Sequence, residues 1–382
     1  MSATLGVILV GAGVIAQVHA RVVRESPDLR LVAVVDPVAD AAEALASQGA
    51  GPHPAVHGSL RDALAADAAD IVVITTPSGS HADLARQALA AGCHVLIEKP
   101  VDIDLHRALE LKEAAEAAPR VVSVMTQNRY APAVASVRRA IEAGRFGRLT
   151  SGTATLAWWR DDAYYASAQW RGTWAADGGG ALMNQGVHTV DVLLTLLGAP
   201  ATVSGVAATV GHDDLEVEDV AGAVITFASG AVATLLATTA AFPENSTRIQ
   251  VHGTTGSAYL QDGALEYFHV DDAHRDGPRN WGRMGDQSAT QVGPEDLAGT
   301  VAMLDLHVAH RRQYDDVVAA IREGRQPDAT VADAVNALAV IISVYISSVV
   351  GHPVRVADVL DGAYDHIDYR TLGAHPAPIA HT

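Results

Sequence analysis

The sequence has few cysteines, lysines and aromatic residues, and these low counts exclude several classes of protein. The single cysteine, Cys93, excludes an internal disulfide and fits a reducing compartment such as the cytoplasm. Basic residues number 26 against 44 acidic ones, and the net charge of −18 argues against nucleic acid or a membrane surface as a partner. The N-terminus shows no basic region followed by an apolar region and a cleavage site, so we expect no secretory signal.

Long uninterrupted apolar runs are also missing. The most apolar stretch near the C-terminus, 334–350, is interrupted by Asn336 and three serines, and we expect a buried helix because the stretch is too short and too polar for a membrane span. Apolar residues make up 49% of the chain and charged residues 18%, as in an ordinary globular protein. A chain of 382 residues is too long for one hydrophobic core. We therefore predict two domains, 1–127 and 128–382.

The start of the chain carries the pattern of a dinucleotide-binding turn. A buried strand, 5–10, runs into Gly-Ala-Gly-Val-Ile-Ala at 11–16, which has the G-x-G-x-x-A form, and then into a helix. The first glycine permits the tight turn, the second lets a pyrophosphate approach the backbone, and the helix N-terminus faces the phosphates. The residues predicted to contact the cofactor on this turn are Gly11, Gly13, Val14 and Ile15.

A second strand, 31–35, ends at Asp36. This is where the fold needs an acceptor for the ribose 2′-hydroxyl, and the complete strand–helix–strand context favours that role. The alternative is that Asp36 only caps the next helix, with Pro37 at its first position. No arginine or lysine occupies 37–39 to receive a 2′-phosphate, which favours NAD over NADP.

Strands then alternate with helices of about ten to fifteen residues, which predicts a parallel, doubly wound sheet. The strand 71–75 is followed by Thr76-Pro77, a turn that should border the cofactor because the carboxyl ends of parallel strands share one edge. His81 follows in the first turn of a helix, where it either contacts the cofactor or is an ordinary helix residue.

The strand 95–97 ends in Glu98-Lys99-Pro100 at the same edge of the sheet. A charged pair at the end of a buried strand is costly as structure but well placed for chemistry. Only one other lysine, Lys112, occurs in the chain, and its position is typical of a helix surface. The alternative interpretation of Lys99 is a strand-end lysine whose stem packs on apolar surface.

The second predicted domain is a mostly antiparallel sheet with helices over one face. Strands are expected at 149–159, 202–210, 220–227, 231–239, 247–253 and 257–260. Threonine, alanine and valine dominate them, and an open face of this kind often pairs with another subunit, so we predict a homodimer or homotetramer. Residues 262–299 should form a long loop.

A helix at 181–191 concentrates the polar residues of this domain. Asn184, His188 and Asp191 fall at i, i+4 and i+7 on one face, after an Asp-Gly-Gly-Gly turn at 177–180. A lone histidine on such a face is usually inert, but the neighbouring tryptophans favour a binding role. Further candidates for contact with a substrate are Trp158, Arg171 and Trp174.

Together these motifs resemble the glucose-fructose oxidoreductase / inositol dehydrogenase / MocA family over nearly the whole chain. The motifs are G-x-G-x-x-A, Glu98-Lys99-Pro100, the Gly-rich turn with His188-x-x-Asp191, and His310-x-x-Gln313. The resemblance implies an NAD(P)-binding domain and an open-sheet substrate domain, with Lys99 as active-site lysine and His188 as helix histidine. It also extends the cofactor contacts to Glu98, Lys99 and Asn128. Many members carry Asp where this chain has Asn184, which puts a Lys–Asp–His relay in doubt.

The expected function is an NAD-dependent oxidoreductase acting at a ring secondary hydroxyl of a sugar, anhydrosugar or inositol, without a metal. His188 is the preferred general base, Lys99 stabilises the developing alkoxide, and Asn184 orients ligand or histidine. An alternative makes Lys99 the base once burial favours its neutral form, with His188 as a substrate contact. Two other classes remain open: NAD-assisted glycoside cleavage and a non-catalytic dinucleotide-sensing regulator.

Overall fold

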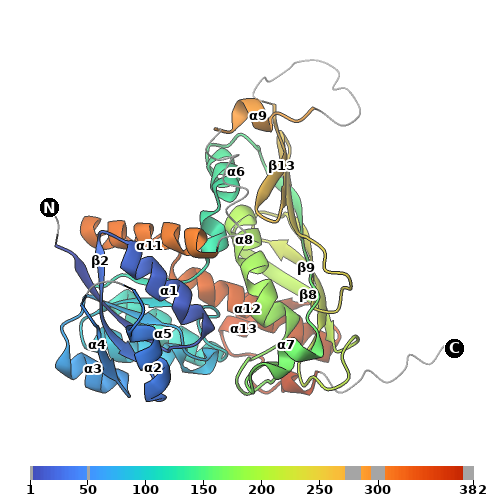
Figure 1. Ribbon diagram of the computed structural model, residues 1–382. Coiled ribbons are helices and arrows are strands. Elements are labelled where there is room, and N and C mark those ends of the chain that lie inside the picture. The colour runs from blue at the N-terminus through green and yellow to red at the C-terminus, as the bar shows by residue number, and fades with distance from the viewer. Residues whose placement is uncertain (1–2, 50–51, 272–284, 294–305, 373–382) are drawn as a thin grey trace, which may run out of the picture. The chain divides into compact units, whose positions relative to one another are not determined.

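The computed structural model describes residues 3–49, 52–271, 285–293 and 306–372 (Figure 1). The chain divides into two compact units. Unit 1 consists of Met1–Gln127, Ala175–Gly178 and Asp305–Val335, and unit 2 consists of Asn128–Trp174, Gly179–Leu304 and Asn336–Thr382. Each unit is thus assembled from segments that are distant in the sequence.

Unit 1 contains a six-stranded parallel sheet in the order β3-β2-β1-β4-β5-β6. The strands are β1 (Leu5–Val10), β2 (Leu29–Val35), β3 (Ala55–His57), β4 (Ile71–Ile74), β5 (His94–Ile97) and β6 (Val122–Val124). The predicted parallel, doubly wound sheet is confirmed. The strand order reverses between β1 and β4, so the crevice for a ligand lies at the carboxyl ends of these two strands.

Six helices of unit 1 accompany this sheet. They are α1 (Val14–Glu25), α2 (Ala39–Ala46), α3 (Leu60–Ala66), α4 (His81–Ala90), α5 (Leu105–Ala117) and α11 (Leu306–Glu323). Helix α11 comes from the far end of the chain, yet it packs beside α1 (Figure 1). Tyr314 and Val317 of α11 join the same apolar core as Val22 and Val23 of α1. Burial of this shared core, rather than sequence proximity, therefore holds α11 in unit 1.

Unit 2 contains an eight-stranded sheet in the order β13-β12-β11-β7-β10-β9-β8-β14. The strands are β7 (Leu149–Ala157), β8 (Pro200–Ala208), β9 (Val220–Phe227), β10 (Val232–Thr238), β11 (Thr247–Gly253), β12 (Gly256–Gln261), β13 (Ala264–Val270) and β14 (Val354–Arg355). Only the β7–β10 pair among them is parallel. The predicted mostly antiparallel sheet is confirmed.

The expected loop at 262–299 is wrong in part. Strand β13 pairs with β12, and the short helix α9 (Ser288–Gln291) follows. Tyr267 and Phe268 of β13 are buried, and Phe268 packs on Phe146. The many Asp and Gly residues around this strand hid its pattern in the sequence. The parts at 272–284 and 294–299 lie outside the described residues.

The helices of unit 2 cover one face of its sheet. Besides α9, they are α6 (Pro132–Glu142), α7 (Asp162–Ala166), α8 (Val187–Leu197), α13 (Val356–Leu360) and the part of α12 (Val331–Val350) from Asn336 onward. Gly205 of β8 donates its N–H to Ser347 of α12, and a Cβ there would lie 2.8 Å from Val344. Among the residues that the structure describes, none covers the opposite face at Val206 and Leu236, which both pair with Gly222 and are 68% and 41% exposed.

Helix α12 differs from expectation in one respect. By length and composition it is apolar enough to cross a membrane, whereas the sequence suggested a segment too short and too polar. The most apolar 18-residue stretch of α12 is 72% buried inside the protein. The core helix of a soluble protein meets the same criterion, so the predicted buried helix describes α12 well.

Candidate active site

The turn after β1 accepts only glycine at position 11. Gly11 has a φ of +97°, and a Cβ there would lie 2.8 Å from the carbonyl oxygen of Thr75. The Thr75 hydroxyl fixes the turn by donating to Val10 O at 2.8 Å. Around Gly13, in contrast, no heavy atom lies within 4 Å of where a Cβ would be, and Val14 is 87% exposed. This open space at the start of α1 fits the approach of a dinucleotide pyrophosphate.

Asp36 links this turn to the next helix. Its Oδ2 accepts the N–H of Ala12 at 2.8 Å, and its Oδ1 accepts the N–H of Val38 at 2.9 Å. A carboxylate has about four acceptor sites, so both hydrogen bonds leave capacity for a ribose hydroxyl. The capping alternative is wrong, because α2 begins at Ala39 after Val38, and no side chain caps it. Asp36 therefore remains available for the ribose, and NAD fits the residues present.

A groove of about 460 Å³ lies at this edge of unit 1. Its lining residues are Val10, Gly11, Val35, Pro37, Gly58, Ser59, Leu60, Arg61, Asp62, Thr76, Leu84 and Gln87. Arg61 was not anticipated, because it stands far from Asp36 in the sequence and reaches the groove only through the fold. It is exposed, so a cation does border the region where a ribose would bind.

His81 is a buried link rather than a surface residue. It is 1% exposed, and its ring nitrogens lie 2.8 Å from the carbonyl oxygens of Thr76 and Pro100. It thereby ties the turn at Thr76-Pro77 to the segment after β5. A direct contact between His81 and the cofactor stays a prediction.

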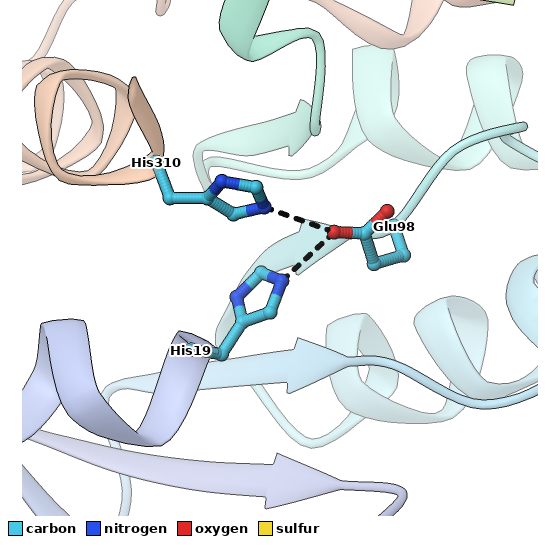
Figure 2. A group of neighbouring side chains, drawn as sticks. All are labelled: His19, Glu98 and His310. Carbon is cyan, nitrogen blue, oxygen red and sulfur yellow. Dashed lines mark hydrogen bonds and ion pairs between the residues drawn. The ribbon is translucent and has the colours of Figure 1, made fainter. Parts of the chain in front are cut away.

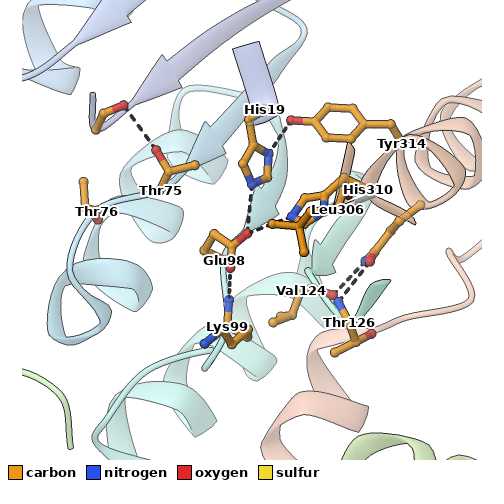
Figure 3. A network of polar contacts seen from close by, with 12 residues as sticks. His19, Thr75, Thr76, Glu98, Lys99, Val124, Thr126, Leu306, His310 and Tyr314 are labelled. Carbon is orange, nitrogen blue, oxygen red and sulfur yellow. Dashed lines mark hydrogen bonds and ion pairs between the residues drawn. The ribbon is translucent and has the colours of Figure 1, made fainter. Parts of the chain in front are cut away.

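Glu98 points into a buried polar network, as Figure 2 shows. Its Oε1 lies 2.9 Å from His19 Nε2 and 3.4 Å from His310 Nε2. The other ring nitrogen of His19 lies 2.8 Å from the Tyr314 hydroxyl (Figure 3). Glu98 Oε2 accepts the main-chain N–H of Lys99 at 3.0 Å. The network thus holds the backbone on which Lys99 stands.

The electrostatics of this network follow from burial and hydrogen bonding. Burial would raise the pKa of Glu98, but hydrogen bonds from His19 and His310 outweigh it and hold the pKa well below its ordinary value. Burial lowers the pKa of His19, against the opposing effect of Glu98. Burial and the charge of Glu98 raise the pKa of Tyr314. At neutral pH the network therefore contains an ionised carboxylate beside a neutral His19 and a neutral phenol.

His310 of α11 is the third side chain in contact around Glu98. Its Nδ1 lies 2.7 Å from the carbonyl oxygen of Leu306, which only accepts, so this nitrogen carries a proton. Its Nε2 lies 3.4 Å from Glu98 Oε1. His19, Glu98 and His310 also have the donor set of a metal site. The contacts of both histidines with Glu98 Oε1 already give the buried carboxylate two polar partners.

In unit 2, the predicted helix consists of a π-helical segment, Ala181–Gly186, that continues into α8. Between Ala181 and Leu193 only Asn184 and His188 are partly exposed, and every other residue is buried. These two residues are four apart, so both lie on one side of the helix. π-Helical turns such as Ala181–Gly186 often occur at functional sites. The helix therefore presents an amide and an imidazole as the two side chains of this stretch that are not buried.

Asp191, the third residue of the predicted polar face, has a structural role. Asp191 is 1% exposed, and its carboxylate binds the guanidinium of Arg129, which is 7% exposed. The two contacts run from Nε at 3.2 Å and from Nη2 at 2.5 Å. Bidentate arginine–carboxylate pairs of this kind form some of the strongest charge-assisted hydrogen bonds in proteins. It ties the turn that contains Asn128, which is itself partly exposed, to α8.

Arg171 lies among aromatic rings. Its guanidinium stands 4.3 Å from the ring of Tyr164 and 4.4 Å from that of Trp170. It also donates to the Tyr164 hydroxyl at 2.6 Å, and Gln185 donates to the same oxygen at 2.9 Å. Arg171 is thereby connected to the π-helical segment through one phenol.

The two candidate tryptophans differ in exposure. Trp174 is 7% exposed and packs edge-on against Tyr345 and Tyr369. Trp158 is partly exposed, with the guanidinium of Arg160 at 4.8 Å from its ring. Trp158 therefore has more surface to offer a ligand than Trp174. Roles for both in substrate binding stay predictions.

The structure divides the predicted site residues between the units. Gly11 to Ile15, Asp36, Thr76, Pro77, His81, Glu98 and Lys99 lie in unit 1, and Asn128, Trp158, Arg171, Trp174, Asn184 and His188 lie in unit 2. Four buried polar residues escaped sequence reasoning as parts of these sites: His19, Tyr314, Arg129 and Glu218. The one signal for His19 was its place on α1, eight residues after Gly11, among the residues that face the sheet.

Comparison with known proteins agrees with this division. Residues 5–126 match a family model described as "Oxidoreductase family, NAD-binding Rossmann fold", and residues 134–259 match the "GFO/IDH/MocA C-terminal domain". The inositol 2-dehydrogenase of Rhizobium meliloti is 32% identical over 258 residues, which is 66% of this chain and 74% of that protein. The levoglucosan dehydrogenase of Pseudarthrobacter phenanthrenivorans is 30% identical over 238 residues, 55% and 60% of the two chains.

A solved structure gives the same answer. The WlbA dehydrogenase from Bordetella pertussis, in complex with NADH and UDP-GlcNAcA, superposes with a TM-score of 0.81 at 29% identity, covering 93% of this chain and 98% of that one. The glycine turn, Asp36 and the open space at Gly13 supply the features that such a cofactor needs. The chain belongs to the Gfo/Idh/MocA oxidoreductase family, and it is an NAD-binding enzyme.

Proposed function

We propose that this enzyme oxidises, or in reverse reduces, a ring secondary hydroxyl position of a sugar, anhydrosugar or inositol. The observation that carries the proposal is that Asn184 and His188 are the only side chains between Ala181 and Leu193 that are not buried. An imidazole can take up a proton near neutral pH, as oxidation of an alcohol requires. The names of the relatives, inositol 2-dehydrogenase and levoglucosan dehydrogenase, support this substrate class.

In the proposed mechanism each residue has a separate task. Bound NAD supplies the acceptor for the hydride that leaves the substrate carbon. His188 takes the hydroxyl proton, and Asn184 orients the histidine or the ligand. Lys99 hydrogen-bonds the same oxygen and stabilises its developing negative charge. The buried Glu98 network supports Lys99 through its main-chain N–H. An assignment with Lys99 as base and His188 as a substrate contact is the alternative.

A turnover screen tests the function. The purified protein is incubated with NAD and a panel of inositols, pyranoses, anhydrosugars and nucleotide sugars, and NADH absorbance is followed. Net NADH formation with a polyol is expected. Glycoside cleavage without net NADH would instead establish the NAD-assisted hydrolase, and NAD binding without any turnover would favour the sensing regulator.

Cofactor preference is checked with the best substrate of that screen. We expect kcat/KM to be at least about fivefold higher for NAD than for NADP, since like charges 4 Å apart repel by about 1 kcal/mol even in water. Asp36 supplies that repulsion toward a 2′-phosphate. The Arg61→Ala variant is the control: it should lower the remaining NADP activity and leave NAD activity unaffected. Equal kcat/KM for the two cofactors would contradict the ribose role of Asp36.

We also propose a cytoplasmic homodimer or homotetramer that uses the open face of the unit 2 sheet. This face carries exposed Val206, Val224, Val232 and Leu236, which a second copy would remove from water. Leu236→Glu is expected to shift the protein toward monomer in light scattering at micromolar concentration. Val349→Glu is the matched control, because Val349 is similarly exposed, 40% against 41%, but lies on α12. A monomeric unmodified protein would reject the proposal.

A further inference from the structure

The start of the helix that carries Asn184 and His188 fits tightly against two residues from elsewhere in unit 2. Gly179 has a φ of +157°, and a Cβ there would lie 2.4 Å from the hydroxyl oxygen of Tyr345. A Cβ on Gly180 would lie 1.8 Å from the main-chain oxygen of Glu218. The two glycines are therefore required so that the turn can approach Glu218 and Tyr345.

Glu218 satisfies three successive N–H groups at this helix start. Its Oε2 accepts from Gly180 at 2.8 Å, its Oε1 accepts from Leu182 at 2.8 Å, and its main-chain oxygen accepts from Ala181 at 2.9 Å. The Tyr345 hydroxyl donates to Oε1 at 2.9 Å. The first N–H groups of a helix have no partner within the helix, and its N-terminus carries a partial positive charge. A carboxylate complements both features.

We propose that Glu218 is a positioning residue: its ionised carboxylate fixes the start of the helix that presents Asn184 and His188, and its protonation releases that start. Glu218 is 0% exposed, so it acts through the helix and not on the substrate. The positioning role rests on the proposed function of Asn184 and His188. The anchoring itself does not.

The chemistry of the carboxyl group explains why protonation matters. An ionised carboxylate offers acceptors on both oxygens, whereas a protonated one turns one oxygen into a donor. A donor facing the N–H of Gly180 or Leu182 repels it, and at least one anchor is lost. Burial raises the pKa of Glu218 to about 7, against the lowering effect of its hydrogen bonds. Both states are thus populated around neutral pH.

Two tyrosines and one aspartate lie around the Glu218 carboxyl group. Tyr345 of α12 donates its hydroxyl to Glu218, and burial raises the pKa of Tyr165 of α7 to about 12, so Tyr165 is neutral near pH 7. The next residue is Asp219. Its carboxylate lies 2.9 Å from His212 Nδ1 and accepts the main-chain N–H groups of Val210 and Gly211. The Asp219 carboxylate is therefore engaged by its own partners.

Hydrogen–deuterium exchange of the full-length protein tests the anchoring without reference to activity. The peptide that spans residues 179–186 is followed between pH 5.5 and 8.5 in the unmodified protein and in Glu218→Gln, which keeps the shape but replaces one acceptor by a donor. At pH 8.5 we expect this peptide to exchange about tenfold or more faster in the variant, as expected for loss of a hydrogen bond to a charged group. The ratio should approach one at pH 5.5, where Glu218 is protonated in the unmodified protein.

Two further variants sharpen the result. Glu216→Gln removes an equal charge two residues away, at an exposed side chain that accepts the main-chain N–H of Trp174. In this variant the 179–186 peptide should exchange as in the unmodified protein. Tyr345→Phe removes a hydrogen bond that favours the ionised form of Glu218, so the pH at which protection appears should move upward. This shift is measurable even if Glu218→Gln folds poorly.

The catalytic readout completes the test. Once a substrate is known, Glu218→Gln should lower kcat about 10- to 100-fold, the cost of a misplaced catalytic group, with the KM for NAD within about twofold. Equal exchange in Glu218→Gln and the unmodified protein at pH 8.5 would overturn the anchoring. A ratio that stays constant with pH would overturn the release by protonation. Normal anchoring without dehydrogenase activity would instead count against the proposed function.

Discussion

Replacing His188 by Ala is expected to lower kcat by about 10²- to 10⁴-fold, the usual contribution of a general base. The acid limb of the kcat–pH profile should also disappear, because the group that must be deprotonated is gone. NAD affinity, measured by fluorescence titration, should hardly change, since the glycine turn and Asp36 belong to unit 1 and His188 to unit 2. The measurement is steady-state kinetics at saturating NAD from pH 5.5 to 9.

Lys99→Met is the companion variant. Loss of one donor to a developing alkoxide costs about 3 kcal/mol, roughly 10²-fold in kcat, while the acid limb should remain because His188 is present. Asn184→Asp should change the rate modestly and move the acid limb to higher pH, because an added negative charge favours the imidazolium. If His188→Ala retains near-normal kcat and pH dependence while Lys99→Met abolishes turnover, Lys99 is the base and the scheme is wrong.

Asp191→Asn is expected to lower the free energy of unfolding by about 3–5 kcal/mol, because it leaves the charge of Arg129 buried without its partner. Both side chains are almost completely buried, so solvent cannot replace the lost carboxylate. Urea unfolding followed by circular dichroism measures the effect.

The double variant Arg129→Met/Asp191→Leu should recover most of that stability, since no isolated charge remains. Glu116→Gln provides the exposed control: Lys112 and Glu116 are 34% and 61% exposed, so breaking their pair should change the free energy of unfolding far less. A loss below about 1 kcal/mol for Asp191→Asn would show that the buried pair contributes little.

Local patterns predicted much of this structure. The strand β1 with Gly11, the switch to antiparallel strands after 149, and the pair Asn184 and His188 each depend on a short stretch of sequence. Strand β13 was missed because its two buried aromatics stand in a polar context and gain stability only by pairing with β12. The π-helical form of Ala181–Gly186 has no local signature.

The buried polar partners were harder to anticipate. Glu98 was expected to face the cofactor, but its carboxylate accepts from His19 and lies against His310, which is 212 positions away in the chain. Glu218 follows an ordinary acidic stretch, and its role appears only when the glycine turn is placed against it. Such partners are selected by tertiary contacts, so neither periodicity nor motif spacing reveals them.

The late arrival of α11 in unit 1 has a consequence for synthesis of the chain. The sheet strands β1 to β6 end at Val124, but α11 begins only at Leu306. A ribosome adding about 5–20 residues per second needs roughly 10–40 s to make the intervening stretch. During that interval His19 and Glu98 have neither Tyr314 nor His310, and the apolar side of α1 lacks its cover. Unit 1 therefore cannot complete its core on the nascent chain until most of unit 2 has emerged, and a pause before α11 would prolong exposure of that surface to chaperones.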